Sequence, residues 1–248
     1  MKLKVLGSSS AGNTYLIESD TECLVLEAGL PFKDVKKALD FNVSKIVGVI
    51  ISHGHFDHFG RAEEYLKSGI PVYASEETHK SLSKEYSSQK IVRPGYWYQI
   101  GGFNVTPFRC EHDVECYGYI IRHDTIGTLL FATDTAFIRE NFKKLKLNHI
   151  LIECNYSIDI VNRYYEEGSI ERSRIDRILQ THMELQTCKD FIKANNTASL
   201  DSIVLLHLSD GNSNADQFQN TIQEVAGKFV RIVIADKGVE VKLDLFPW

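Results

Sequence analysis

Residues 53–58 of the chain read His-Gly-His-Phe-Asp-His, which places four side chains able to bind a metal within one short stretch. The preceding residues 45–51, Lys-Ile-Val-Gly-Val-Ile-Ile, form a β-branched run typical of a buried strand. Imidazole and carboxylate groups suit zinc and its first-row neighbours. The motif therefore predicts a metal site at the end of a strand, because a merely solvated turn would not cluster its histidines there.

The composition is that of an ordinary globular protein. The chain has 248 residues, of which 43% are hydrophobic and 25% charged, and residues 1–248 are expected to form a single domain. No run approaches the roughly 18 apolar residues of a membrane span, and the chain starts with a strand-like segment, so we expect a cytoplasmic protein. The five scattered cysteines argue against a disulfide framework.

The charge balance bears on the substrate. The chain carries 28 basic and 33 acidic residues, a formal net charge of −5. An acidic protein on average repels a polyanion, so wide contact with duplex DNA is disfavoured, although a local basic patch would reverse this inference.

Further candidate ligands follow other predicted strands. His112 comes after a strand that ends near Phe108, Asp134 follows the strand over residues 128–132, and His207 follows the strand over residues 202–206. Cys110 and Cys116 flank His112 and are alternative thiolate ligands, although small buried cysteines are common.

These motifs, taken in order, resemble those of the metallo-β-lactamase fold superfamily. The resemblance implies an α/β protein built as a four-layer αββα sandwich. It implies two divalent metal ions per chain, zinc in the first place and manganese as the alternative. It also implies that Glu27, where the family usually has Asp, supports the metal loop. The implied ligands are His53, His55 and His112 for one ion, Asp57 and His58 for the other, Asp134 as the bridge, and His207.

A later stretch resembles the nuclease and phosphodiesterase branch of this superfamily, which includes tRNA 3′-processing endonucleases and YycJ/WalJ-like exonucleases. In residues 181–187, Thr-His-Met-Glu-Leu-Gln-Thr, the resemblance places His182 at the opening of a helix and near the scissile phosphate, as the acid for the leaving oxygen. A helix-capping role is the alternative. Asp57 would orient the attacking hydroxide, while Ser209 and Asn13 are candidate substrate contacts.

The resemblance leaves two substrate classes open. The glycine-serine loop over residues 7–13 and the Glu-Cys-Asn stretch at 153–155 look similar to YycJ, which implies a DNA exonuclease or an RNA-processing nuclease acting on strand ends. The acidic balance and the compact layout are closer to phage anti-Pycsar proteins, which are homodimers that hydrolyse cyclic mononucleotides. We expect a cyclic mononucleotide or another small nucleotide phosphodiester, and thus a role against nucleotide-signalled antiviral defence.

The segment over residues 155–177 could serve either substrate. Its aromatic side chains could stack on a base and its arginines could meet phosphate, across a homodimer interface or within one chain. A solvated helix with a tyrosine-lined packing face is the alternative. The residues concerned are Tyr156, Tyr164, Tyr165, Arg172, Arg174 and Arg177.

Two hypotheses from other classes remain. One is a thioester or lactone hydrolase on the same metal centre, whose activity would not need His182. The other is a binding module that keeps the fold without catalysis, which the complete ligand set disfavours.

Overall fold

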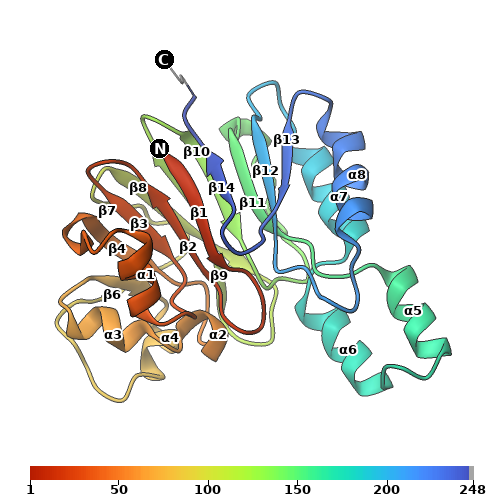
Figure 1. Ribbon diagram of the computed structural model, residues 1–248, viewed down its shortest axis with the longest axis horizontal. Coiled ribbons are helices and arrows are strands. Elements are labelled where there is room, and N and C mark those ends of the chain that lie inside the picture. The colour runs from red at the N-terminus through yellow and green to blue at the C-terminus, as the bar shows by residue number, and fades with distance from the viewer. Residues whose placement is uncertain (246–248) are drawn as a thin grey trace.

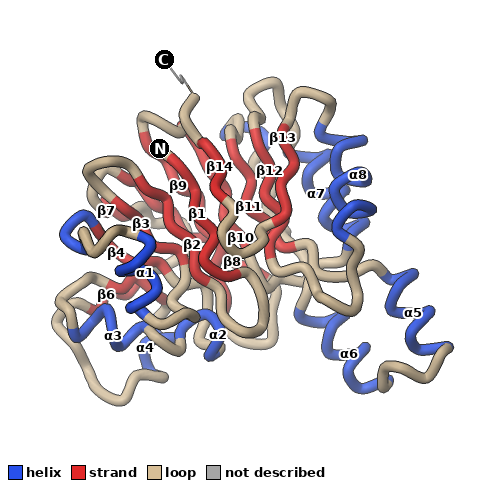
Figure 2. The backbone as a smooth tube through the Cα atoms, in the orientation of Figure 1, coloured by secondary structure: helices blue, strands red, loops and turns tan. Residues whose placement is uncertain are grey.

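The computed structural model, which describes residues 1–245, contains two mixed β-sheets packed face to face with helices on both outer faces (Figures 1 and 2). Across the first sheet the strands are β14 (Glu240–Lys242), β1 (Lys2–Gly7), β2 (Thr14–Glu18), β3 (Cys23–Leu26), β4 (Ile46–Ile50), β5 (Val72–Ala74) and β6 (Gln89–Ile91). Across the second they are β13 (Arg231–Ile234), β12 (Ser202–Leu206), β11 (His149–Glu153), β10 (Gly127–Ala132), β9 (Cys116–His123), β8 (Phe103–Cys110) and β7 (Tyr98–Ile100).

The helices lie outside the sheets or extend from them. They are α1 (Phe32–Ala38), α2 (Phe56–Phe59), α3 (Ala62–Lys67), α4 (Glu76–Lys80), α5 (Ile158–Glu166), α6 (Arg172–Thr181), α7 (Leu185–Asn195) and α8 (Ala215–Ala226), with short 3-10 turns η1 (Val43–Lys45) and η2 (Lys143–Leu145). No helix in residues 1–245 has the length and apolarity needed to cross a membrane.

Three buried apolar clusters separate the four layers. One lies between the two sheets and contains residues of both, such as Tyr15 and Phe131, whose rings meet edge to face. A second joins the outer face of the second sheet to α7 and α8, and a third joins the first sheet to α1 and α3. Each layer buries its apolar face against the next, which is the αββα sandwich predicted from the sequence.

Strand direction brings several strand ends to one edge of the sandwich. In the first sheet β3, β4 and β5 run parallel, and in the second sheet β10, β11, β12 and β13 run parallel. The carboxyl ends of parallel strands meet at the same edge, where loops carry functional residues. The predicted ligands therefore start from neighbouring positions.

Some predicted elements differ from the structure. The polar stretch over residues 158–180 is rich in Arg and Glu, which predicts a helix, but the structure forms two helices there, separated by a turn in which Gly168 has a φ of +69°. The helix-forming residues from Glu76 to Tyr86 give only the short α4, and α8 was not predicted at all. The strands around the metal motifs are confirmed.

Helices α5 and α6 extend away from the sandwich, as Figure 1 shows. They have a small apolar cluster of their own, formed by Tyr156, Val161, Ile175 and Ile178. A bridge between Tyr156 and Glu184 ties the base of this arm to the start of α7. The arm is therefore packed internally and fixed at its base.

Candidate metal centre

The predicted ligands converge at the shared edge of the two sheets. Two of them, Asp134 after β10 and His207 after β12, adopt left-handed backbone conformations with φ of 45° and 52°. This conformation is uncommon outside glycine, although Asp and His tolerate it better than most residues. The chain turns sharply at each position, just where its strand ends.

Three histidines form the first cluster. The ligand nitrogens of His53, His55 and His112 all lie within 4.8 Å of one another. His112 donates from Nδ1 to the carbonyl oxygen of Thr181 at 2.9 Å, so its Nε2 is left facing His55 Nδ1 at 3.3 Å. Such a bond at one ring nitrogen fixes the tautomer and aims the other at a metal. This geometry fits the ligand set expected for one ion.

His58 and Asp134 form the second cluster together with His53. His58 Nε2 lies 3.3 Å from Asp134 Oδ1 and 3.2 Å from Asp57 Oδ2. Both Asp57 and His58 belong to the one-turn helix α2, which begins directly after His55. The three side chains predicted for the second ion and the bridge, Asp57, His58 and Asp134, thus lie together, with His53 of the first set beside them.

A third cluster contains Asp134, His207, Glu153 and His182. His207 Nδ1 lies 2.8 Å from Asp134 Oδ1, and His182 Nδ1 donates to Glu153 Oε1 at 2.6 Å. The other oxygen of Glu153 accepts from the backbone nitrogen of Thr135 at 2.8 Å. Glu153 is fully buried, and its carboxylate fixes the orientation of the His182 ring through this hydrogen bond.

The position of His182 differs from its prediction. It does not open a helix but is the C-cap residue of α6, in an extended conformation before α7. Glu153 is not among the residues predicted for the site, although its position as the last residue of β11 resembles that of the predicted ligands. A buried carboxylate at a strand end was the signal that could have identified it.

Glu27 lies behind the centre, as the resemblance implied. Its Oε1 accepts from the backbone nitrogen of Ser52 at 3.1 Å, and its Oε2 lies 3.5 Å from His58 Nδ1. Glu27 is fully buried and has a φ of +66°. The longer side chain therefore still anchors the metal loop through Ser52 and brings a carboxylate oxygen within ion-pair distance of His58.

Asn13 and Ser209, the candidate substrate contacts, have different surroundings. Asn13 is fully buried, and its amide nitrogen donates to Asp57 Oδ2 at 3.2 Å and lies 3.0 Å from His58 Nε2. From this position the Asn13 amide orients Asp57 and His58. Contact between Asn13 and a substrate would require the hydrogen bond to Asp57 to break. Ser209 is half-buried and lines two surface cavities beside the centre.

Burial and charge set the protonation of the cluster. Burial lowers the pKa of His53 well below its usual value, which favours the neutral ring that binds metals. Burial opposes ionisation of Asp134, but His207 and His58 outweigh it and hold the pKa of Asp134 well below its usual range. Burial would also lower the pKa of His182, yet Glu153 raises it overall. A protonated His182 suits a proton donor.

The donor set fits divalent cations. Within residues 1–245, His53 Nε2 and His207 Nε2 are buried without a hydrogen-bond partner, a costly state that a metal ion would relieve. The clustered histidines and carboxylate fit a dinuclear site. Burial raises the pKa of the Cys116 thiol well above its usual value, and that thiol donates to the carbonyl oxygen of Asp134 at 3.6 Å. Cys116 is thus placed as a packing residue.

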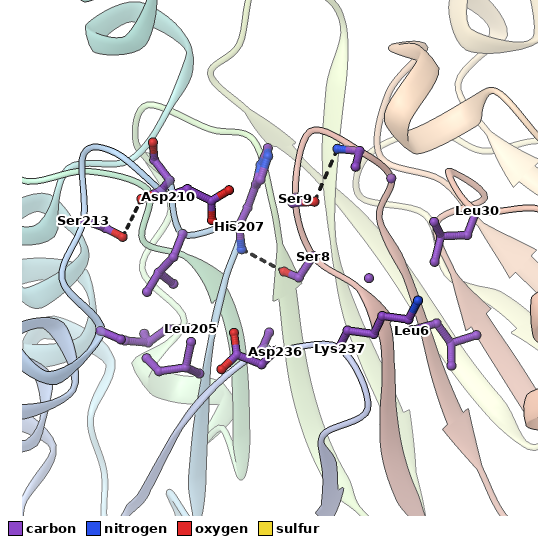
Figure 3. Close-up of a pocket in the computed structure, with 18 residues that line it drawn as sticks. Leu6, Ser8, Ser9, Leu30, Leu205, His207, Asp210, Ser213, Asp236 and Lys237 are labelled. Carbon is purple, nitrogen blue, oxygen red and sulfur yellow. Dashed lines mark hydrogen bonds between the residues drawn. The ribbon is translucent and has the colours of Figure 1, made fainter. Parts of the chain in front are cut away.

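Two cavities of about 470 Å³ each flank the loop over residues 8–11 beside the centre. Figure 3 shows the first, whose wall includes Leu6, Leu205 and Lys237. The backbone nitrogen of His207 donates to Ser8 Oγ at 2.8 Å, which fixes the loop between the cavities. The second cavity is lined by His182 and by arginines of α6. Each cavity has room for a ligand next to the predicted metal ligand His207.

Comparison with known proteins agrees with this geometry. Exodeoxyribonuclease YycJ of Bacillus anthracis is 26% identical over 252 residues, covering 96% of this chain and 90% of that protein. The metallo-beta-lactamase fold protein YhfI from Bacillus subtilis superposes with a TM-score of 0.74 at 19% identity, covering 97% of this chain and 99% of that one. The short form of human tRNase Z gives 0.68 at 14% identity, covering 99% and 100%. The family model matches residues 9–159, more than half of the sequence, so the chain belongs to the metallo-beta-lactamase superfamily.

Proposed function

We propose that this protein is a metal-dependent hydrolase of nucleotide phosphodiester bonds. The observation that carries the proposal is the hydrogen bond of 2.6 Å between His182 Nδ1 and Glu153 Oε1 in the third cluster, because it fixes the imidazole ring and leaves Nε2 available as a proton donor. The proposed ligands are His53, His55, Asp57, His58, His112, Asp134 and His207. Bound cations would supply an activated water and neutralise phosphate charge.

Two residues of the chain would then act on the two sides of the phosphate: Asp57 on the attacking water and His182 on the leaving oxygen. Asp57 is half-buried and lies 3.2 Å from His58 Nε2, so its carboxylate can hold and orient the attacking water. His182 has Nδ1 occupied by Glu153, which leaves Nε2 to donate a proton to the leaving oxygen. Glu153 would keep the His182 ring in this orientation while the proton is transferred. Phosphodiester hydrolysis needs mainly such positioning and charge neutralisation.

Two substrates fit this chemistry. The first is a cyclic mononucleotide, favoured by the acidic chain and by the size of the cavities, about 470 Å³ each. The second is the end of a DNA strand, favoured by the similarity to YycJ along nearly the whole chain. A terminal nucleotide would occupy the same cavity while the rest of the strand lies outside.

The test is an activity panel on protein loaded separately with zinc and with manganese. Its substrates are 2′,3′- and 3′,5′-cyclic mononucleotides, single-stranded and duplex DNA, an RNA precursor and a thioester. We expect phosphodiester hydrolysis that depends on His182. Turnover of the thioester alone, unaffected by His182→Ala, would refute the proposal and support a thioester or lactone hydrolase. Fewer than one bound ion per chain would instead revive the non-catalytic binding module.

A further inference from the structure

Two arginines of α6 line the cavity beside His182. Arg174 and Arg177 are three residues apart, so they project from one face of the helix. Both side chains are exposed, and within residues 1–245 neither has a carboxylate oxygen within 4.0 Å. By contrast, Arg172 on the same helix pairs with Asp176, with Nε 3.0 Å from Oδ1. Two unpaired guanidinium groups therefore face this cavity.

The arginines are held in a fixed position relative to the predicted ligands. Ile175 and Ile178 of α6 are buried in the small apolar cluster of the arm. The helix ends at Thr181, whose carbonyl oxygen accepts from His112, and the next residue is bound to Glu153. The metal centre and the arginine-bearing face thus form one connected structure, so the arginines are not on a freely moving arm.

The second cavity differs in charge from its neighbour. The wall of the cavity in Figure 3 mixes aliphatic residues with serines, and its one lysine, Lys237, stands next to Asp236. Asp210 lines both cavities, so it does not distinguish them. The side of the centre that carries His182 is therefore the more positive one, despite the acidic character of the whole chain.

Unpaired arginines are suited to phosphate, which a guanidinium group binds through two parallel hydrogen bonds. In the proposed function the scissile phosphate lies at the metal centre. A cyclic mononucleotide has no other phosphate, so it would leave both arginines without a ligand. A nucleic-acid strand presents a further phosphate at every nucleotide. The arginines thus distinguish the two candidate substrates.

We propose that Arg174 and Arg177 bind a backbone phosphate next to the scissile one, so that the substrate is the end of a nucleic-acid strand. This inference rests on the proposed function. It places the departing strand along α6, on the side of the proton donor His182. The two arginines are substrate-binding residues and take no part in proton transfer.

The test compares the double variant R174A/R177A with R172A, which removes the same kind of charge from the same helix outside the cavity. A second control, K189A, removes a charge from α7, where Lys189 lines neither cavity and its Nζ lies 2.8 Å from Glu224 Oε2. Binding of a short phosphorothioate-linked single strand, which resists cleavage, is measured by fluorescence anisotropy on metal-loaded protein at several salt concentrations. Steady-state kinetics are measured on an unmodified strand and on a cyclic mononucleotide.

We expect the double variant to raise the Kd and KM for the strand by about tenfold or more with kcat nearly unchanged. The slope of log K against log salt should become shallower by about 0.7 for each phosphate that the variant no longer neutralises. Both controls should behave like wild type, and kinetics on the cyclic mononucleotide should not change. R174K/R177K should restore most of the salt slope, which separates charge from damage to the helix.

Three outcomes would overturn the inference: an unchanged strand Kd in the double variant, an equal loss with R172A or K189A, or an equal loss on the cyclic mononucleotide. Failure of the proposed function gives a different result. In that case the metal-loaded wild type cleaves no phosphodiester, and arginine-dependent strand binding is then judged from anisotropy alone.

Discussion

Replacing Glu27 with Gln should weaken one metal site and spare the other. In the wild type, Glu27 Oε2 faces His58 Nδ1 at 3.5 Å, while Oε1 accepts from the Ser52 backbone nitrogen at 3.1 Å. In the variant the amide oxygen can still serve Ser52, but the NH2 group then faces His58 Nδ1. The imidazole proton is therefore driven to Nε2, the nitrogen that lies near Asp57 and Asp134. A protonated Nε2 cannot bind a cation.

The expected loss of metal affinity in E27Q can be taken from the usual effect of such supporting contacts. Loss of a partner that orients a ligating histidine typically weakens metal binding by about 10- to 100-fold, or roughly 1.4 to 2.8 kcal/mol. Only the ion held by His58 should be affected, because His55 and His112 belong to the other cluster and His112 is oriented by Thr181.

The assay is competition with a chelator of known affinity, followed by the metal content per chain. E22Q is the matched control, since Glu22 Oε1 also faces a histidine, His123 Nε2, at 3.0 Å but outside the three clusters. E27Q should release one ion at a lower chelator concentration, whereas E22Q should match wild type. Wild-type affinity for both ions in E27Q, at an unchanged Tm, would refute the reasoning.

Four further predictions follow from the same structure. H182A should lower kcat on phosphodiesters by about 10²- to 10⁴-fold with little change in KM, and equal kcat values would exclude it as the proton donor. In G29A the added Cβ would lie 1.8 Å from the carbonyl oxygen of Asp57, so we expect a loss of about 1–3 kcal/mol in urea denaturation, compared with near neutrality for G211A in open space. Chelation should abolish activity and lower the Tm, since an ion at about 100 times its Kd contributes about 2.7 kcal/mol, and added zinc or manganese should reverse both effects. Burial raises the pKa of Glu18, but its two paired lysines, Lys4 and Lys45, outweigh this effect and lower the pKa overall. These ion pairs therefore stabilise the fold above the unfolded pKa near 4.5, and their stabilisation is lost as the pH falls. E18Q should reduce the loss of unfolding free energy at acidic pH, measured by urea denaturation.

The strands and predicted ligands could be read from the sequence because both signals are local. A β-branched run followed by a polar cluster marks a buried strand and its end, as at His53 and His207, and parallel strands bring such ends together. Glu153 has the same local pattern, but a single carboxylate after a strand is common. Its importance depends on His182, which is distant in the sequence and contacts it only after folding.

Other features depended on tertiary packing. The sequence of residues 172–177 shows three arginines but does not show which of them face the site. In the structure Ile175 and Ile178 are buried in the arm, and Arg174 and Arg177 line the cavity. The polar stretch over residues 158–180 is interrupted at Gly168, which adopts a positive φ. Helix propensity alone does not predict this interruption, because a single glycine costs a helix only about 1 kcal/mol. Asn13 is a predicted substrate contact in a glycine-serine loop, and only the fold shows that its side chain is buried and donates to Asp57.

The left-handed corners at Glu27, Asp134 and His207 have a consequence for engineering. Each holds a side-chain-bearing residue in a conformation that glycine adopts without strain, at a cost of roughly 1–2 kcal/mol. Glycine would remove this strain, but it would also remove a buried carboxylate or imidazole and, with it, the stabilisation that a bound ion supplies. An attempt to make the protein more heat-resistant should therefore leave these three corners unchanged and alter other parts of the chain.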